Sequence, residues 1–351
     1  ADLFATEPGR GAPASINFVS CHDGFTLTDL TRYRSKHNEA NGENNNDGSS
    51  VNHSANFGVE GVTDDPDVIA AREQAAMNMI GMLLLSLGTP MMLAGDEFRN
   101  TQDGNNNAYC QDNDITWLKW DWMYSTNKTR EMRRLETVSR LVALRKSLDL
   151  YHHEDFFTRL TQIGLLKPSS RVQWFLPDGT TPMERDWFDL GVRSFTMRLL
   201  SNSEVDVCIV VNGTADDRTF RLPPDTHWTP KWCSAEINGR RAGHGTQVEE
   251  CDLNGDTTVW TQHVPDASET VLKMVEEVAM QRTESSTENE ADTIKFAMPV
   301  TDHAANGTSS APRDEVSADM PDAPVDDTPD TPVDDNVWTM PALSITLMKQ
   351  V

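Results

Sequence analysis

His22 and Asp23 are the residues whose types and position best suit chemistry in this chain. They end the apolar run 16–21 and precede Gly24, where a short strand would give way to a turn. An imidazole beside a carboxylate can move protons or hold a polar substrate. In a (β/α) barrel the reacting groups lie at the carboxyl ends of the strands. The pair therefore predicts a site at a strand end, and the alternative is a pair that only caps the strand.

The elements around this pair alternate between strand and helix. After the predicted strand 16–21 come a polar loop at 24–65 and a helix that begins near Pro66, capped by Asp64 or Asp65, and ends before Gly88. A buried strand at 91–94 then ends on Asp96 and Glu97. A second polar loop at 99–114 precedes a helix at 126–148. This order indicates two consecutive β/α units with charged residues at both strand ends, too few to close a barrel.

The second half of the chain has the texture of an antiparallel sheet. Short β-rich runs at 172–176, 194–200, 205–211 and 219–222 are separated by turn residues. A Pro/Asp-rich acidic segment at about 267–335 interrupts them and is predicted to be largely disordered. The run at 342–348 alternates like a closing strand of the same sheet. We therefore predict an α/β domain at 1–150 and an all-β sandwich domain at 151–351.

The overall charge excludes some partners. The 351 residues carry 55 acidic and 30 basic side chains, a formal charge of -25, which argues against nucleic acid and anionic membranes. Between residues 284 and 335 the chain has 14 acidic and 2 basic residues, so this stretch alone contributes -12. No apolar run is judged to reach transmembrane length, and no signal peptide opens the chain. The oligomeric state is not predicted.

The cysteines favour a reducing compartment. Their number, five, is odd and no two have the C-x-x-C spacing, which fits reduced thiols and a cytoplasmic location. A bridge between Cys233 and Cys251 stays open as an alternative. No metal site and no cofactor are predicted. Because the first residue is Ala1 rather than Met, we expect a processed product or a fragment.

Several ordered motifs carry a resemblance to a known family. The stretch 17–27 (NFVSCHDGFTL) resembles the last catalytic motif of the alpha-amylase superfamily. The stretches 36–44 and 56–61 are similar to loops of its isoamylase-type bacterial glycogen-debranching enzymes. The stretches 88–98 and 101–112 resemble their eighth barrel strand and the loop after it. The match is dense from about residue 15 to 147 and looser beyond.

The resemblance implies a fold and a missing part. The two β/α units would be the seventh and eighth of a (β/α)8 TIM barrel, with the β-sandwich packed behind it. The family's nucleophilic aspartate and acid/base glutamate lie on the fourth and fifth strands, which would precede Ala1. We therefore expect the carboxyl-terminal portion of a longer enzyme, and an isolated chain without turnover.

The resemblance also assigns roles to the residues that remain. Asp23 would be a transition-state-stabilising third carboxylate, and His22 a donor to a hydroxyl group of the same sugar. The predicted substrate-binding residues are the following: Asp96, Glu97, Asn105, Tyr109 and Asp112. For Asp96 and Glu97 the alternative is a helix cap or an internal salt bridge. For the other three it is hydrogen bonding within the loop.

The predicted function is retaining hydrolysis of α-1,6 branch linkages in glycogen or limit dextrin. One alternative is a non-catalytic glucan-binding or scaffold protein derived from the same family. Another is a different amylase-type hydrolase, such as one that releases trehalose. The stretches 39–44 and 56–61 argue against that third possibility.

Overall fold

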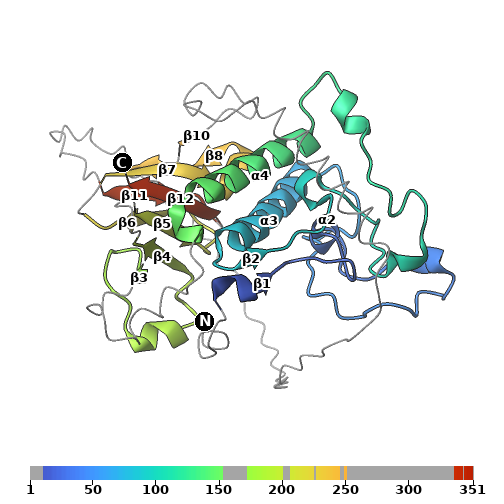
Figure 1. Cartoon of the computed structure of the whole chain (residues 1–351), viewed down its shortest axis with the longest axis horizontal. Helices are drawn as coiled ribbons and strands as arrows, with labels where there is room; N and C mark the ends of the chain where they lie inside the picture. The colour runs from blue at the N-terminus through green and yellow to red at the C-terminus, as the bar shows by residue number, and fades with distance from the viewer. Residues whose placement is uncertain are drawn as a thin grey trace, which may run out of the picture. The chain divides into compact units, whose positions relative to one another are not determined.

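The computed structural model describes residues 11–152, 172–200, 206–224, 227–245, 249–250, 336–342 and 344–350 (Figure 1). Contacts divide the chain into two units, Ala1–Met274 with Val333–Val351, and Val275–Pro332. All described residues belong to the first unit. The acidic segment predicted at about 267–335 lies outside the described residues.

The predicted β/α order is present, but its strands are shorter than expected. Strand β1 (Ile16–Asn17) pairs in parallel with β2 (Thr89–Pro90), and α3 (Pro66–Leu85) lies between them in the chain. The predicted strand extents 16–21 and 91–94 are therefore wrong. Only two residues of each strand find a ladder partner, and the backbone beyond them is irregular.

Both long helices begin at a polar cap. The Asp65 carboxylate accepts hydrogen bonds from the backbone N–H groups of residues 67 and 68, and Pro66 follows as the first helical residue. Helix α4 (Arg130–Ser147) is capped by Thr129, which explains why it starts later than the predicted residue 126. Arg145 of α4 donates to the backbone carbonyls of Ser86 and Gly88, 2.8 Å each, and so binds the chain that leaves α3.

Short helical segments occupy the loops. One α-helical turn, α2 (Leu27–Leu30), follows the end of β1. The 3-10 segments are η1 (Ala12–Ala14), η2 (Glu39–Asn41), η3 (Asp96–Phe98), η4 (Ala108–Cys110), η5 (Asp121–Tyr124), η6 (Asp149–Tyr151), η8 (Glu184–Phe188) and η9 (Ser234–Asn238).

The second half forms antiparallel sheets. The five-stranded sheet has the order β3 (Val172–Phe175), β4 (Ser194–Leu199), β5 (Val207–Asn212), β12 (Ser344–Gln350), β7 (Trp228–Cys233). A three-stranded sheet has the order β6 (Arg218–Arg221), β11 (Val337–Met340), β9 (Gly243–His244). Strands β8 (Arg240–Arg241) and β10 (Glu249–Glu250) pair separately. The prediction that the last run returns to the same sheet is confirmed, because β12 lies between β5 and β7.

The five-stranded sheet is buried on both faces. In β5, Val207 and Ile209 belong to a core shared with α3 and α4, whereas Cys208 and Val210 belong to a core shared with β6 and β11. This alternation follows from the two-residue period of a strand. Helices α3 and α4 therefore cover one face of the sheet, and the small sheet covers the other (Figure 1).

Helix α3 corrects the expectation that no run reaches transmembrane length. By length and composition alone it could cross a membrane. More than half of its most apolar 18-residue stretch, 56%, is buried within the fold, and the Arg72 and Glu73 side chains of the helix are buried too. The core helix of a soluble protein passes the same test.

Candidate functional site

His22 and Asp23 lie on an exposed turn just beyond β1. Their side chains are 86% and 72% exposed, and His22 Nε2 lies 3.3 Å from Asp23 Oδ2. Gly24 follows with a φ of 87°, a conformation that favours glycine. The Gly24 N–H donates to the Asn106 carbonyl at 3.0 Å, so the second polar loop lies against this turn.

Asp96 holds both ends of that turn together. It is 2% exposed and accepts a hydrogen bond from the Ser20 hydroxyl on one oxygen and, at 2.9 Å, from the Leu27 N–H on the other. Burial raises the pKa of Asp96 to about 6, although these hydrogen bonds and Arg134 oppose the shift. Asp96 therefore fixes residues 20 and 27, between which His22 and Asp23 lie.

A buried cluster of charged side chains contacts the backbone of Asp96. The Arg134 guanidinium is 2.8 Å from the Glu73 carboxylate and donates to the backbone carbonyl of Asp96 at 3.5 Å. Arg99 reaches the other Glu73 oxygen at 3.2 Å. Burial alone would raise the pKa of Glu73, but the two guanidinium groups lower it. Helices α3 and α4 are thus linked by charges to each other and to Arg99, which directly follows η3.

The two polar loops interlock through amide side chains. Asn38 and Asn106 each donate to the other at 2.9 Å, from a side chain in one case and from the backbone in the other. Asn41 and Asn105 form a second such pair, with distances of 2.8 and 3.4 Å. Asn41 also donates to Asp47 at 2.7 Å. Hydrogen bonds from Asn41 and then from residue 107 lower the pKa of Asp47.

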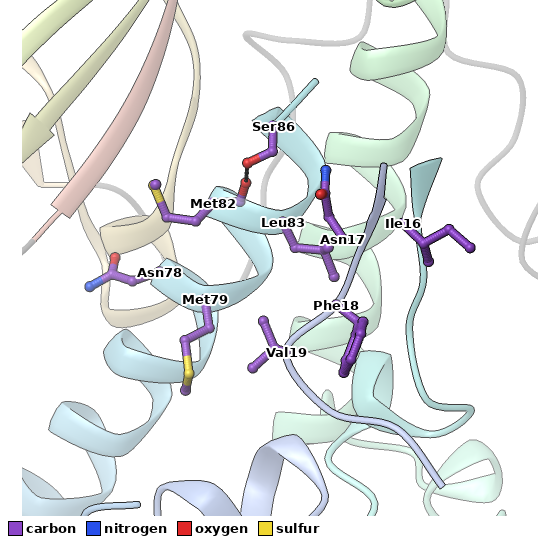
Figure 2. A pocket seen from close by; sticks show the side chains of 9 residues that line it. All are labelled: Ile16, Asn17, Phe18, Val19, Asn78, Met79, Met82, Leu83 and Ser86. Atoms are coloured by element: carbon purple, nitrogen blue, oxygen red, sulfur yellow. Dashed lines mark hydrogen bonds between the residues drawn. The ribbon is translucent and has the colours of Figure 1, made fainter. Parts of the chain in front are cut away.

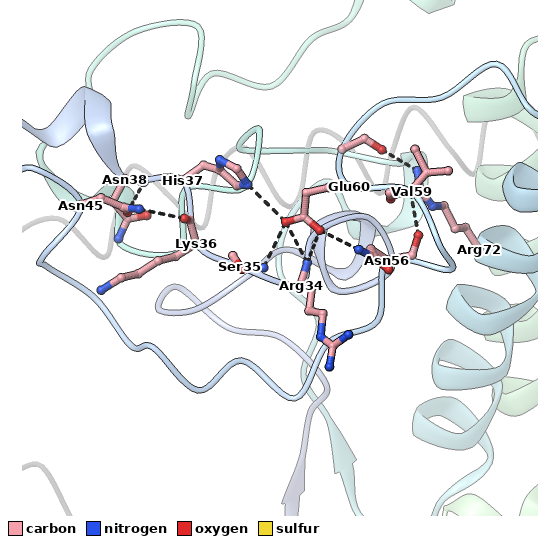
Figure 3. Close-up of polar contacts among 11 residues, drawn as sticks. Arg34, Ser35, Lys36, His37, Asn38, Asn45, Asn56, Val59, Glu60 and Arg72 are labelled. Atoms are coloured by element: carbon pink, nitrogen blue, oxygen red, sulfur yellow. Dashed lines mark hydrogen bonds and ion pairs between the residues drawn. The ribbon is translucent and has the colours of Figure 1, made fainter. Parts of the chain in front are cut away.

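Glu60 organises the first polar loop. Its carboxylate accepts from the backbone N–H groups of Arg34 and Ser35 at 2.9 to 3.1 Å, from the Asn56 amide at 2.8 Å, and lies 3.2 Å from His37 (Figure 3). Burial alone would raise the pKa of Glu60, but these hydrogen bonds outweigh it and lower the pKa to about 2. The loop therefore closes around an ionised carboxylate.

The predicted substrate-binding residues fall into two groups. Asn105 and Asp96 are 1% and 2% exposed and use their side chains within the fold. Tyr109 is 80% exposed, and exposed Asp112 accepts from the Trp117 indole at 3.0 Å. Glu97 is half-buried and accepts from the Gly95 N–H at 2.9 Å.

The burial of each predicted substrate-binding residue decides whether its side chain could contact a sugar. Asp96 and Asn105 have almost no surface for a sugar in this structure, since their polar atoms bind other parts of the fold. Contact of Tyr109, Asp112 and Glu97 with a sugar stays a prediction.

Several residues that build the site were not predicted individually. Asn38, Asn41, Asn106 and Glu60 lay within polar loops whose role was predicted only as a whole. The available signal was composition, because 38–47 and 105–107 concentrate amide side chains. Within the described residues, no group of three or more His, Cys, Asp or Glu side chains is placed to hold a metal ion.

An apolar groove of about 550 Å³ lies beside β1 and the carboxyl-terminal half of α3 (Figure 2). Ile16 and Phe18, on its β1 side, are 60% and 54% exposed, and Met82, on α3, is 49% exposed. Val19 also lines the groove, and it packs against the core that includes α3. One face of the β1 segment is therefore covered and the other is open.

Comparison with curated proteins decides the relationship. The glycogen operon protein GlgX homolog of Mycobacterium tuberculosis (strain ATCC 25618 / H37Rv) is 45% identical over 197 residues, 55% of this chain and 26% of that protein. The glycogen debranching enzyme of Pectobacterium atrosepticum is 38% identical over 242 residues, 68% of this chain and 34% of that protein. This chain is a homologue of bacterial glycogen-debranching proteins. The predicted resemblance is confirmed.

The match has a limited extent. The chain spans between about a quarter and a third of the length of these glycogen-debranching relatives. No protein-family model matches it.

Similar solved structures include a pullulanase complexed with maltotetraose from Anoxybacillus sp. LM18-11, with 17% identity and a TM-score of 0.41 over 68% of this chain and 26% of that chain. The catalytic module of the pneumococcal glycogen-degrading factor SpuA has 12% identity and a TM-score of 0.45 over 100% of this chain and 38% of that chain.

Proposed function

We propose that this chain supplies part of the active site of a retaining α-1,6-glucan debranching hydrolase. The homology to a glycogen debranching enzyme, combined with an exposed His22–Asp23 turn beyond β1, carries this proposal. The substrate would be a branched α-glucan such as glycogen or its limit dextrin.

Asp23 would act on the transition state. Hydrolysis of a glycosidic bond passes through an oxocarbenium-like state, and retaining enzymes hold a nucleophile and an acid/base about 5 to 5.5 Å apart. A further carboxylate that binds sugar hydroxyls more tightly in this state raises the rate. Asp23 is exposed enough for that role, and His22 beside it can donate to the same sugar.

The nucleophile and the acid/base would come from other polypeptide. Asp96 is buried and hydrogen-bonded through both carboxylate oxygens, so it is poorly placed to attack a sugar. Glu97 is half-buried and accepts from a backbone N–H. The open face of Ile16 and Phe18 beside the groove gives the additional polypeptide a surface to cover.

The test compares this chain with a chimera. The amino-terminal part of the Mycobacterium tuberculosis relative, up to its alignment with this chain, is joined to residues 11–351, and release of reducing ends from limit dextrin is measured. We expect no release by the chain alone and release by the chimera. Efficient release by the chain alone, or a folded chimera that binds glucan without cleaving it, would refute the proposal. The second result would favour a glucan-binding protein.

A further inference from the structure

A second cavity, of about 280 Å³, lies between the first turns of α3 and α4 and the segment η9. It is remote in sequence from the His22–Asp23 turn, and no role has been assigned to it above. The residues that line it are Pro66, Ile69, Ala70, Glu73, Arg130, Arg133, Ile237 and Asn238. Two arginines thus line a cavity whose remaining wall is mainly aliphatic.

The charges of this cavity are unbalanced. Glu73 is the one carboxylate among its eight lining residues, and it is already paired with Arg134 at 2.8 Å and Arg99 at 3.2 Å. Among the described residues, Arg130 and Arg133 have no carboxylate within ion-pair distance. The Nε atom of Arg133 is buried without a hydrogen-bond partner. A buried donor without a partner costs free energy. An anion between Arg130 and Arg133 would offset the unpaired positive charges of the two side chains.

The excess of positive charge extends to Arg99, which pairs with Glu73 of the cavity lining. Two guanidinium nitrogens of Arg99, Nε and Nη1, are also buried without a hydrogen-bond partner, and the Arg99 side chain is only 7% exposed. Its second carboxylate neighbour, Glu131, lies 3.9 Å away. Such a concentration of arginine is unexpected in a chain with a formal charge of -25, and it favours a negatively charged ligand.

The helices add a smaller effect of the same sign. Arg130 is the first residue of α4, and Pro66 is the first residue of α3, so both helices begin at the cavity. Helix amino-terminal ends carry partial positive charge. At α3 the Asp65 carboxylate already accepts from the N–H groups of residues 67 and 68, so the effect left for a ligand comes mainly from α4. The helices have 18 and 20 residues, long enough for this effect to be felt.

We propose that this cavity binds the phosphate group of a small phosphate ester. Arg130 and Arg133 would hold the phosphate, because a guanidinium group matches its geometry with paired hydrogen bonds. Ile69 and Ile237 would contact the organic part. The Asn238 side-chain oxygen could accept from a hydroxyl group, since its nitrogen donates to the Ala70 carbonyl at 3.0 Å. The proposal does not depend on the debranching function.

The test measures binding to the full 351-residue chain by isothermal titration calorimetry at constant ionic strength. The probes are inorganic phosphate, glucose 1-phosphate and neutral glucose. We expect the two phosphates to bind, glucose not to bind, and Arg130→Gln or Arg133→Gln to weaken binding about tenfold each, the effect of one charge-assisted hydrogen bond. Tighter binding of glucose 1-phosphate would identify an ester as the ligand, and equal binding would identify free phosphate.

A matched control separates the site from general charge. Arg185→Gln removes the same charge from a side chain that is 77% exposed and is not among the residues lining the cavity, so phosphate affinity should not change. Arg130 is exposed, so its variant is expected to fold, and circular dichroism checks this. Absence of phosphate binding, or equal affinity in wild type and in a folded Arg130→Gln variant, would overturn the proposal.

Discussion

Asp96 contributes to the site through the turn that it holds rather than through its own exposure. Its two carboxylate oxygens bind Ser20 and Leu27, one before and one after the His22–Asp23 pair. Each carboxylate oxygen of Asp96 accepts one of these two hydrogen bonds. Burial makes the ionised form of the carboxyl group costly. Position and ionisation of Asp96 are therefore coupled to the geometry of the turn.

Asp96→Asn should change how stability depends on pH. The folded-state pKa of about 6 lies above the ordinary value of 3.8, so the folded state holds this proton more tightly than the unfolded state does. Protonation of Asp96 therefore stabilises the folded state below pH ~4. This stabilisation, roughly 3 kcal/mol at most, is lost as pH rises through pH ~6. As pH rises from 4 to 7, the unfolding free energy of the wild type, measured in denaturant, should fall relative to that of Asp96→Asn. A difference that does not change with pH would contradict this prediction.

At the scale of elements, α3 and the sheet meet at a glycine. A Cβ atom at Gly81 would lie 2.8 Å from the Cη2 atom of Trp232, whose ring is fully buried. The indole has no free space, so the close approach of helix and β7 requires a residue without a side chain.

Gly81→Ala should destabilise the chain by about 1 to 3 kcal/mol, the usual cost of overpacking, despite the better helix propensity of alanine. Thermal and denaturant unfolding measure the change. Trp232→Phe provides the control, because the smaller ring should relieve the overlap and make the double variant more stable than the sum of the single effects. Simple additivity would show that the contact is not limiting.

The Glu60 loop offers a second prediction at this scale. Glu60→Gln replaces one acceptor oxygen by a donor, so the Arg34 and Ser35 N–H groups lose hydrogen bonds, and their amide exchange should become faster. Hydrogen exchange measured by NMR tests this, with Glu39→Gln as the control. In the wild type the loop should loosen only as pH falls below about 4 toward the pKa of about 2, because the carboxylate must be protonated first. Unchanged exchange at Arg34 would sink the prediction.

The elements differ in how well the sequence predicts them. Helix α3 could be predicted closely because Asp65 and Pro66 are local signals for its start. The extents of β1 and β2 could not, since a strand is defined by a partner distant in sequence, here Ile16 opposite Thr89. The Asn38–Asn106 pair could not either, because it joins residues 68 positions apart.

At the scale of the whole molecule, the open face of β1 is the feature that most needs explanation. Ile16, Phe18 and Met82 expose apolar surface beside a groove, although the opposite side of the same segment is packed. Exposed apolar patches of this kind mark surfaces that another partner covers.

Phe18→Ser should therefore act differently in two contexts. In the isolated chain it should reduce aggregation, because the side chain is 54% exposed there. In the chimera it should lower stability by about 3 kcal/mol, the order expected for removing a large buried apolar side chain. Light scattering and thermal unfolding measure the two effects. Val62→Ser, at a position that is 73% exposed and outside the groove lining, should have little effect in either protein.

The predicted division of this chain into domains at 1–150 and 151–351 stays a prediction. In this chain, α3, α4 and the five-stranded sheet share one core that includes Leu141 and Leu347. The sequence could predict both kinds of element but not that they pack together, because no local pattern specifies which face of the sheet a helix covers.

The central claim is that Asp23 assists a sugar-cleaving site whose principal acids lie on other polypeptide. The most direct measurement is the kcat of the chimera on limit dextrin with Asp23 and with Asp23→Asn, together with glucan affinity. We expect Asp23→Asn to lower kcat by a factor of about 10² to 10³ with little change in affinity, because the carboxylate acts mainly on the transition state. The matched variant Asp178→Asn, in the turn after β3, should keep the parental rate. An unchanged kcat for Asp23→Asn would contradict the account.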